Sequence, residues 1–250
     1  MAFDEALLRS FDQCSKPILR LYGWNPPAIS LGRFQKAGEV LDTDCCSANG
    51  TGVVRRITGG GVIYHADELT YSIICAPEQI PETNSIKDSF RVLTGFLLRF
   101  YRDLGLDACY AADVSCAGEK LGERTPFCFA GKETYDILVN GRKIGGNAQR
   151  RLKQVIFQHG SIPVLDRVAE GVSCMRHRPD NLEGRVTCLA AEGVMPDTEY
   201  LKSVLKRAFC SNLDTNLRET GPVGREIRLA DRLLREKYLN DKWNLNGEGD

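Results

Sequence analysis

Three consecutive glycines, Gly59, Gly60 and Gly61, directly follow a segment whose β-branched residues predict a strand over 53–57. Because glycine carries no Cβ, the backbone of such a run can approach a ligand or another segment closely. The run lacks the lysine and Ser/Thr that complete a Walker phosphate loop, and its spacing does not match a dinucleotide fingerprint. Two interpretations remain open from the spacing: a ligand-binding loop, or a glycine-rich corner flanked by solvated arginines.

The segments around the glycine run alternate between strand and helix patterns. An apolar stripe of helical period predicts a long helix at 85–104, with Gly105 as its C-terminal stop. Asn140 and Gly141 predict a tight hairpin, because both residue types tolerate the positive φ of a type I′ turn. Further strands are predicted at 17–24, 28–32, 62–64, 69–75, 135–139 and 155–164, and further helices at 3–14, 197–209 and 226–238.

The length and composition allow one large core. The chain has 250 residues, 42% of them hydrophobic, and no stretch resembles an interdomain linker. Long helices among many strands are typical of a mixed architecture. We therefore expect an α/β (α+β) fold in which a single domain over residues 1–250 packs helices on a mixed β-sheet.

The charge and hydropathy patterns argue against several classes of function. Basic and acidic residues balance at 33 each, so no overall field holds a polyphosphate backbone. No apolar run approaches the roughly 18 residues of a membrane span. Residues 1–15 lack the features of a signal or transit peptide. We expect a cytoplasmic protein that binds neither nucleic acid nor membrane.

The ten cysteines form no Cys-x-x-Cys pair and are scattered along the chain. The spacing therefore indicates neither a zinc ribbon nor a thioredoxin-like redox site, and the scatter does not indicate a disulfide scaffold. We expect all ten thiols to be reduced. Cys128 lies between two phenylalanines, and by itself this position is typical of a small buried hydrophobic residue.

A second glycine-containing segment follows the Asn-Gly turn. Gly145 and Gly146 come directly after Lys143 and Ile144, and glycines within a strand weaken it unless a ligand or another backbone comes close. Lys143 alone would be interpreted as an exposed strand lysine. His65 and His159 are expected to be packed or hydrogen-bonded rather than metal ligands, since neither has a partner at a ligand spacing. No metal site is predicted.

Together these segments resemble the lipoate and biotin protein ligase catalytic family, and the resemblance covers nearly the whole chain. The family pattern Arg-Arg-x-x-Gly-Gly-Gly ahead of a histidine is matched at 55–65. The pattern Lys-Ile-x-Gly-x-Ala-Gln before Gln-His-Gly is matched at 143–160. Within the family the chain is most similar to the cysteine-dependent octanoyltransferase branch, through Cys128-Phe129, Tyr135-Asp136-Ile137 and the Glu-Leu-Thr-Tyr-Ser sequence at 68–72. The resemblance implies the catalytic fold of this family.

The chain departs from the family at its ends. Members usually begin with an additional strand and loop before the first helix, whereas this sequence starts at Met1-Ala2-Phe3-Asp4. We expect that one edge strand is missing, or that the true start lies upstream. The accessory C-terminal domain of many ATP-dependent ligases is also not expected, which favours the transferase branch.

The resemblance implies thioester chemistry. A free cysteine is only a few per cent thiolate at pH 7, and a neighbouring cation increases that fraction. The resemblance assigns Cys128 as the nucleophile and Lys143 as its electrostatic partner. It also implies substrate-binding roles for a further set of residues, namely Arg56, Gly59, Gly60, Gly61, His65, Gly145, Gly146, Ala148 and His159.

The implied donor is octanoyl-acyl carrier protein. The implied acceptor is the lysine of a lipoyl carrier domain, such as the glycine-cleavage H protein or a 2-oxoacid dehydrogenase E2, and no cofactor is expected. The main alternative is an ATP-dependent lipoate-protein ligase that acts through lipoyl-adenylate with ATP and Mg²⁺. An octanoyl amidotransferase and a non-catalytic carrier-binding protein are also open. Arg55, Arg56, Arg150 and Arg151 are candidates for a local basic patch that meets an acidic carrier.

Overall fold

The computed structural model describes residues 1–12, 14–81, 85–114, 126–128, 131–179, 182, 184–195 and 197–249. Phe129 of the Cys-Phe pair therefore lies outside the described residues. Helices and strands alternate along the described chain, as the sequence patterns predict, and the mixed α/β class is confirmed. The strands of the described residues divide among three sheets rather than forming one.

The principal sheet is antiparallel and carries one face of the functional site. Its strand order is β1-β5-β10-β9, and its register places Ser161 opposite both Thr70 and Gly146. Alternate residues point to opposite faces of a sheet, so each strand contributes to two environments. The strands are β1 Ile18–Tyr22, β5 Glu68–Cys75, β9 Gly146–Arg151 and β10 Ile156–Pro163.

Two smaller sheets flank the principal one. One has the order β11-β8-β7-β6 and contains the predicted Asn-Gly hairpin, with φ of 50° at Asn140 and 74° at Gly141. The other has the order β3-β2-β4 and leads into the glycine run. The strands are β2 Ala28–Leu31, β3 Gly52–Arg55, β4 Ile63–His65, β6 Ala108–Tyr110, β7 Ile137–Val139, β8 Arg142–Ile144 and β11 Val186–Thr187.

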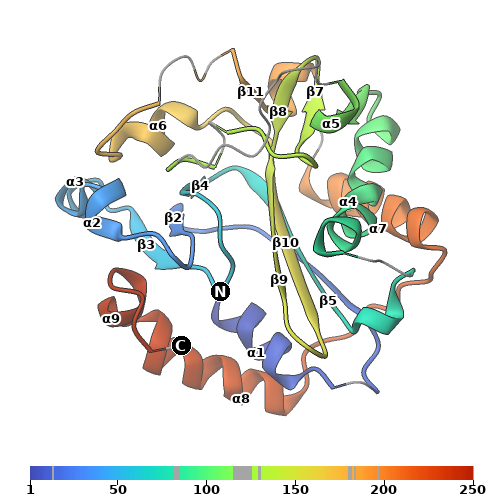
Figure 1. Ribbon diagram of the computed structural model, residues 1–250, viewed down its shortest axis with the longest axis horizontal. Helices are drawn as coiled ribbons and strands as arrows, with labels where there is room; N and C mark the ends of the chain where they lie inside the picture. Colours follow the sequence, from blue (N-terminus) through green and yellow to red (C-terminus); the bar gives the residue numbers. More distant parts are fainter. Residues whose placement is uncertain are drawn as a thin grey trace.

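Two long helices cover one face of the principal sheet. Helix α4 (Ile86–Asp103) begins at Ser85, whose side chain accepts a hydrogen bond from the Asp88 amide, and helix α7 (Thr198–Leu213) begins in the same way at Asp197. Phe96 of α4 packs edge-on against Tyr71 of β5. Figure 1 shows α4 and α7 on one side of β5, β9 and β10, and the small sheet of β2, β3 and β4 on the other. The functional site lies on the side away from the long helices.

The shorter helices lie around the edges of the sheets. Helix α1 (Ala2–Ser10) confirms the predicted N-terminal helix, and α8 with the π-helical turn that follows it covers the predicted segment 226–238. The remaining helical segments are α2 Ala37–Val40, α3 Thr43–Ala48, η1 Pro77–Gln79, α5 Ala111–Val114, α6 Val168–Ser173, η2 Ala190–Glu192, α8 Gly224–Leu233, η3 Leu234–Tyr238 and α9 Asp241–Asn244.

Two adjacent carboxylates join α1 to distant parts of the chain. Asp4 is buried and accepts hydrogen bonds from Arg20 and Tyr22 of β1. Glu5 is also buried and is bound by Lys237 and Tyr238 of η3. Buried carboxylates are stable only when paired or hydrogen-bonded. The pair therefore fastens the N-terminal helix to the principal sheet on one side and to the C-terminal segment on the other.

The cysteine prediction is wrong for one pair. Cys45 of α3 and Cys174, which follows α6, form a disulfide with a Cα–Cα distance of 5.4 Å. The pairing joins segments 129 residues apart, so no local spacing in the sequence announces it. The other described cysteines are free. In the part of the chain that the structure describes, no helix is long and apolar enough to cross a membrane.

Candidate active site

Cys128 is held beside the end of the glycine run. Its amide donates to the carbonyl of Val62 at 3.0 Å, and the Val62 amide donates to the carbonyl of Pro126 at 2.8 Å. A Cβ on Gly61 would lie 2.6 Å from the Cys128 nitrogen, which is closer than real Cβ contacts. The last glycine of the run is therefore required for the backbone that carries Cys128 to pack against it.

The thiol of Cys128 faces Gly146, the first residue of β9. A Cβ on Gly146 would lie 3.1 Å from Sγ of Cys128 and 3.8 Å from the nearest carbon of Ile63. Gly146 and Ile63 both line a narrow cavity of about 270 Å³, a volume that includes space open to solvent. The thiol therefore lies next to the part of this cavity that Gly146 lines, and we call the space the acyl cavity below.

The acyl cavity crosses the principal sheet on the face away from α4 and α7. The register pairs Gly146 with Ser161, Ser161 with Thr70, and Thr70 with Tyr22, so these four residues form a row from β9 to β1. At a strand separation of about 4.8 Å the row spans about 14 Å. Small side chains in its first three positions leave room above the sheet. Ala148 and His159, which pair with each other two register positions away, line the same cavity.

Aromatic side chains close the β1 end of the acyl cavity. Trp24 donates from Nε1 to the Thr70 hydroxyl at 2.9 Å, and its ring stacks on His65 with centroids 4.1 Å apart. Tyr22 donates to Asp4 at 2.7 Å, and burial first of all raises its pKa well above the usual value. The phenol is therefore neutral, and two hydrogen-bonded aromatic side chains without charge close this end.

The two histidines of the site are buried and hydrogen-bonded, as the sequence predicts. His65 lies between Ser30 at 2.6 Å and Glu68 at 2.8 Å. Nε2 of His159 lies 2.7 Å from the hydroxyl of Thr58, in the loop between β3 and the glycine run. Burial, followed by the positive charge of Arg56, lowers the pKa of His159 to about 3. His159 is therefore neutral at physiological pH.

Lys143 is buried, contrary to the expectation for an isolated strand lysine. Its Nζ lies 2.6 Å from the Asp136 carboxylate and donates to the carbonyl oxygens of Cys128 at 2.8 Å and Gly131 at 3.1 Å. Burial alone would lower the pKa of Lys143, but the negative charges of the Cys128 thiolate and Asp136 outweigh it and raise the pKa. Lys143 is therefore a charged group attached to the segment that carries the thiol.

Asp136 is the functional residue that sequence reasoning missed. The Tyr135-Asp136-Ile137 motif was available as a signal, but the sequence does not show that its carboxylate turns toward Lys143. Asp136 is buried and also accepts a hydrogen bond from the Glu133 amide at 2.7 Å. The carboxylate is thus fixed in place and holds the lysine in turn.

The prediction that Arg55 and Arg56 form a surface basic patch is wrong, since both side chains are 1% exposed. Arg55 donates to backbone carbonyls that include those of Gln35 and Trp243. Two neutral carbonyls, of Gly59 at 3.1 Å and of Gly61 at 2.8 Å, accept from Nη2 of Arg56. Irregular backbone beside the glycine run leaves carbonyls without strand partners, and the guanidinium groups satisfy them. Arg150 and Arg151, the other two candidates, are half-buried.

The glycines do not share one role. Gly146 lines the acyl cavity, whereas Gly59, Gly60 and Gly61 are not among its lining residues. Instead, the Gly59 and Gly61 carbonyls accept hydrogen bonds from Arg56, and Gly61 packs against the backbone of Cys128. Gly145 has a φ of 85°, and a Cβ there would lie 2.2 Å from the Ser161 carbonyl oxygen. Its function is to let β8 and β9 turn tightly against β10.

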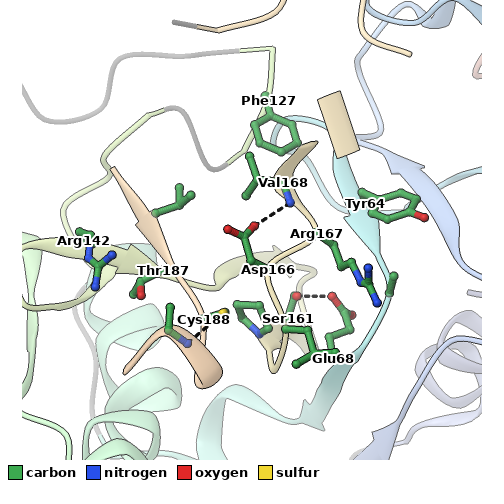
Figure 2. A pocket seen from close by; sticks show the side chains of 15 residues that line it. Tyr64, Glu68, Phe127, Arg142, Ser161, Asp166, Arg167, Val168, Thr187 and Cys188 are labelled. Atoms are coloured by element: carbon green, nitrogen blue, oxygen red, sulfur yellow. Dashed lines mark hydrogen bonds between the residues drawn. The ribbon is translucent and has the colours of Figure 1, made fainter. Parts of the chain in front are cut away.

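A larger pocket of about 670 Å³, a volume that includes space open to solvent, is lined by residues that include Phe127, Arg142 and Ser161. Figure 2 shows its lining, with Phe127 and Val168 at one end, and Glu68 hydrogen-bonded to Ser161 at the other. Ser161 lines both this pocket and the acyl cavity, and Phe127 precedes Cys128 in the chain. The two spaces are therefore neighbours at Ser161 of β10, and the residue that precedes the thiol lines the larger one.

Cys128 and Lys143, which the resemblance pairs, lie together in the structure, since Nζ of Lys143 donates to the Cys128 carbonyl. Comparison with family descriptions gives a match to "Lipoyl protein ligase A/B catalytic domain" over residues 1–210. The chain belongs to this family. The resemblance inferred from the sequence is thereby confirmed.

Curated relatives in the lipoyl protein ligase A/B family are named octanoyltransferase LipM. The relative from Kyrpidia tusciae is 35% identical, and the match covers 98% of this chain and 93% of the relative. The relative from Staphylococcus aureus is also 35% identical, with 97% and 92% covered. These relatives agree with the branch that Cys128-Phe129 and the 68–72 sequence indicate.

Solved structures confirm the catalytic fold. A putative lipoate protein ligase from Thermoplasma acidophilum with bound lipoic acid has a TM-score of 0.81 at 28% identity, with 98% of this chain and 92% of that chain covered. Lipoate-protein ligase A bound with ATP has the same TM-score and coverages at 27% identity. These solved structures are named as ligases, whereas the curated sequence relatives are named as transferases.

Proposed function

We propose that this chain is an acyltransferase that moves an octanoyl group from acyl carrier protein to the lysine of a lipoyl carrier domain through a thioester on Cys128. The octanoyltransferase activity is supported by the curated relatives, which match nearly the whole chain. The observation that carries the chemical step is the position of the Cys128 thiol against Gly146, beside the acyl cavity. Residues 1–250 would serve as one catalytic domain, without a cofactor.

In the first half-reaction the Cys128 thiolate attacks the carbonyl carbon of the donor thioester. A new carbon–sulfur bond forms to Cys128, the bond to the carrier's sulfur breaks, and the carrier's thiolate takes a proton from water. One thioester is exchanged for another of similar energy, so no nucleotide is required. Lys143, fixed by Asp136 at 2.6 Å, stabilises the negative charge before and during attack.

The acyl cavity would hold the hydrocarbon chain. Burial of six methylenes at about 0.8 kcal/mol each contributes about 5 kcal/mol, which favours a medium chain over acetyl. The small residues Gly146, Ser161 and Thr70 provide the passage across the sheet. Trp24 and Tyr22 limit its length at the β1 end.

In the second half-reaction the amine of the acceptor lysine attacks the Cys128 thioester. An amide bond forms, the carbon–sulfur bond to Cys128 breaks, and the thiolate is regenerated beside Lys143. The amine loses its proton to solvent. We propose the glycine-cleavage H protein or a 2-oxoacid dehydrogenase E2 domain as the acceptor. A solved structure with 27% identity and a TM-score of 0.81, described as a bi-partite lipoate protein ligase and its E2 lipoyl domain, supports this class of acceptor.

The test is acylation without nucleotide. Incubation with octanoyl-acyl carrier protein should add one octanoyl group to the Cys128 peptide, detected by mass spectrometry, and an added lipoyl domain should then remove it. Cys128→Ala should lose both steps. Cys109→Ala is the matched control, because Cys109 is also free and half-buried but lies on β6. Full activity in Cys128→Ala would refute the proposal.

An ATP-dependent lipoate ligase is the second candidate, since the solved neighbours include a lipoate-protein ligase with bound ATP. In that case Lys143 and the 55–61 segment would hold an acyl-adenylate, and Cys128 would be a bystander. Release of pyrophosphate that requires both lipoate and ATP, unchanged in Cys128→Ala, would decide for the ligase. The two functions therefore differ in their dependence on one thiol.

A further inference from the structure

Lys143 is not the isolated positive charge beside the Cys128 thiol that the family resemblance implied, because it is paired with Asp136. Lys143 lies 2.6 Å from Asp136, and both side chains are buried. Such a pair has no net charge, and its field falls off faster with distance than that of a single ion. Lys143 therefore offers the thiolate only part of the attraction of a full positive charge.

Arg56 is a second buried cation, and its charge is not shared in this way. Its hydrogen bonds run to neutral groups: the Ser30 carbonyl and hydroxyl from Nη1, and the Gly59 and Gly61 carbonyls from Nη2. Nε is buried without a hydrogen-bond partner. Among the ion pairs of the described residues none includes Arg56. The guanidinium thus carries an unneutralised charge in the protein interior, which is costly without a counter-charge.

The position of Arg56 brings this charge to the part of the acyl cavity beside the thiol. Arg56 lines the cavity together with Gly146, whose Cα faces the Cys128 sulfur. Nη2 is bonded to Gly61, and Gly61 abuts the Cys128 nitrogen. The Arg56 side chain and Cys128 are therefore connected through one packed glycine.

The other titratable groups facing Arg56 do not supply the missing negative charge. His159 is neutral, because burial and Arg56 itself lower its pKa to about 3. Tyr22 is neutral, because burial raises the pKa of its phenol. His65 reaches Arg56 only through Ser30, and it is itself bound to Glu68. Burial lowers the pKa of Arg56 to about 10, and the negative charge of Cys128 is the main influence opposing that decrease.

We propose that Arg56 is the second cation of the thiol site, and that its guanidinium stabilises the Cys128 thiolate with the net positive charge that the Lys143–Asp136 pair lacks. Ser30, held by His65, positions the guanidinium. The proposal rests on the proposed function only in taking Cys128 as the reacting thiol. It assigns the glycine-run arginine to activation of the nucleophile rather than to binding of a substrate.

The experiment measures thiolate formation without the acyl donor. The rate of iodoacetamide alkylation of the Cys128 peptide is followed by mass spectrometry as a function of pH. In Arg56→Gln the midpoint of the profile should move to higher pH by about 1 unit or more. Arg55→Gln is the matched control, because Arg55 is equally buried and also bonded to carbonyls, but does not line the acyl cavity. Its profile should coincide with that of the wild type.

Equal midpoints in wild type and folded Arg56→Gln would overturn the proposal, as would an equal displacement in Arg55→Gln. If Arg56→Gln does not fold, the double variant Lys143→Met/Asp136→Leu gives an independent test. This double variant removes the partial contribution of Lys143 together with its counter-charge, so the midpoint should rise by less than about 0.5 unit, whereas a larger rise would show that Lys143, not Arg56, supplies most of the charge. Failure of the transferase proposal is distinguishable, since it appears as absence of an octanoyl adduct on wild-type Cys128.

Discussion

Replacement of Gly146 by alanine should slow catalysis at Cys128 while leaving the stability of the fold nearly unchanged. The added Cβ would lie 3.1 Å from Sγ of Cys128, against ordinary contacts of about 3.5–4.0 Å. The next atom, of Ile63, is 3.8 Å away and needs no movement. The sulfur must therefore move by roughly half an ångström, and misplacement on that scale costs about tenfold in rate. We expect acylation of Cys128 by an octanoyl thioester to slow at least about tenfold.

The assay is single-turnover acylation followed by mass spectrometry, beside thermal unfolding of the same samples. Gly145→Ala is the contrasting variant, because φ is 85° there and the new Cβ would lie 2.2 Å from the Ser161 oxygen. It should cost about 2 kcal/mol or more in stability, or roughly 4–8 °C in melting temperature. Gly52→Ala, with no atom within 4 Å of the new Cβ, is the neutral control. Wild-type acylation by Gly146→Ala would refute the placement of the thiol beside the acyl cavity.

Three further outcomes follow from the same geometry. Asp136→Asn should lower the free energy of unfolding by about 3–5 kcal/mol in chemical denaturation, because it leaves Lys143 buried without its carboxylate. Glu39→Gln, in an exposed pair with Lys36, should change the free energy of unfolding by less than about 1 kcal/mol. Trp24→Ala should open the β1 end of the acyl cavity and improve transfer of decanoyl relative to octanoyl by up to about tenfold in competition assays, and an unchanged preference would contradict the closed end. The free energy of unfolding should fall by about 1.4 kcal/mol between pH 7.5 and 5.5 on account of His159. In the unfolded chain this histidine binds a proton below its usual pKa of about 6.5, whereas in the folded protein its pKa is about 3. Thermal unfolding of His159→Gln should lack this part of the pH dependence.

Local patterns in the sequence were sufficient for the elements around the site. The Asn140-Gly141 turn forms because positive φ is tolerated at both residues, and the helix predicted at 85–104 is present as Ile86–Asp103 with Ser85 as its cap. Each of these features depends on neighbours in the chain. The positions of Cys128 and Lys143 on either side of the hairpin could be inferred for the same reason.

Features that depend on distant residues were not predictable in this way. The closing wall at Trp24 is 46 residues from its partner Thr70, and Arg55 is bonded to Trp243 across 188 residues. Charge composition treats an arginine as exposed, but a guanidinium with five donors can satisfy buried carbonyls in irregular backbone. The prediction for Arg55 and Arg56 failed because those carbonyls become visible only in three dimensions.

The C-terminal segment is linked to the site more tightly than the extent of the family match indicates. That match ends at residue 210, yet Arg55 donates to the carbonyls of Trp243 and Leu245, and Glu5 is bound by Lys237 and Tyr238. A deletion after residue 210 would remove two carbonyl acceptors from the buried guanidinium of Arg55 and two hydrogen-bond donors from the buried carboxylate of Glu5. The end of the family match at residue 210 is therefore not a boundary at which the chain can be shortened without loss of stability.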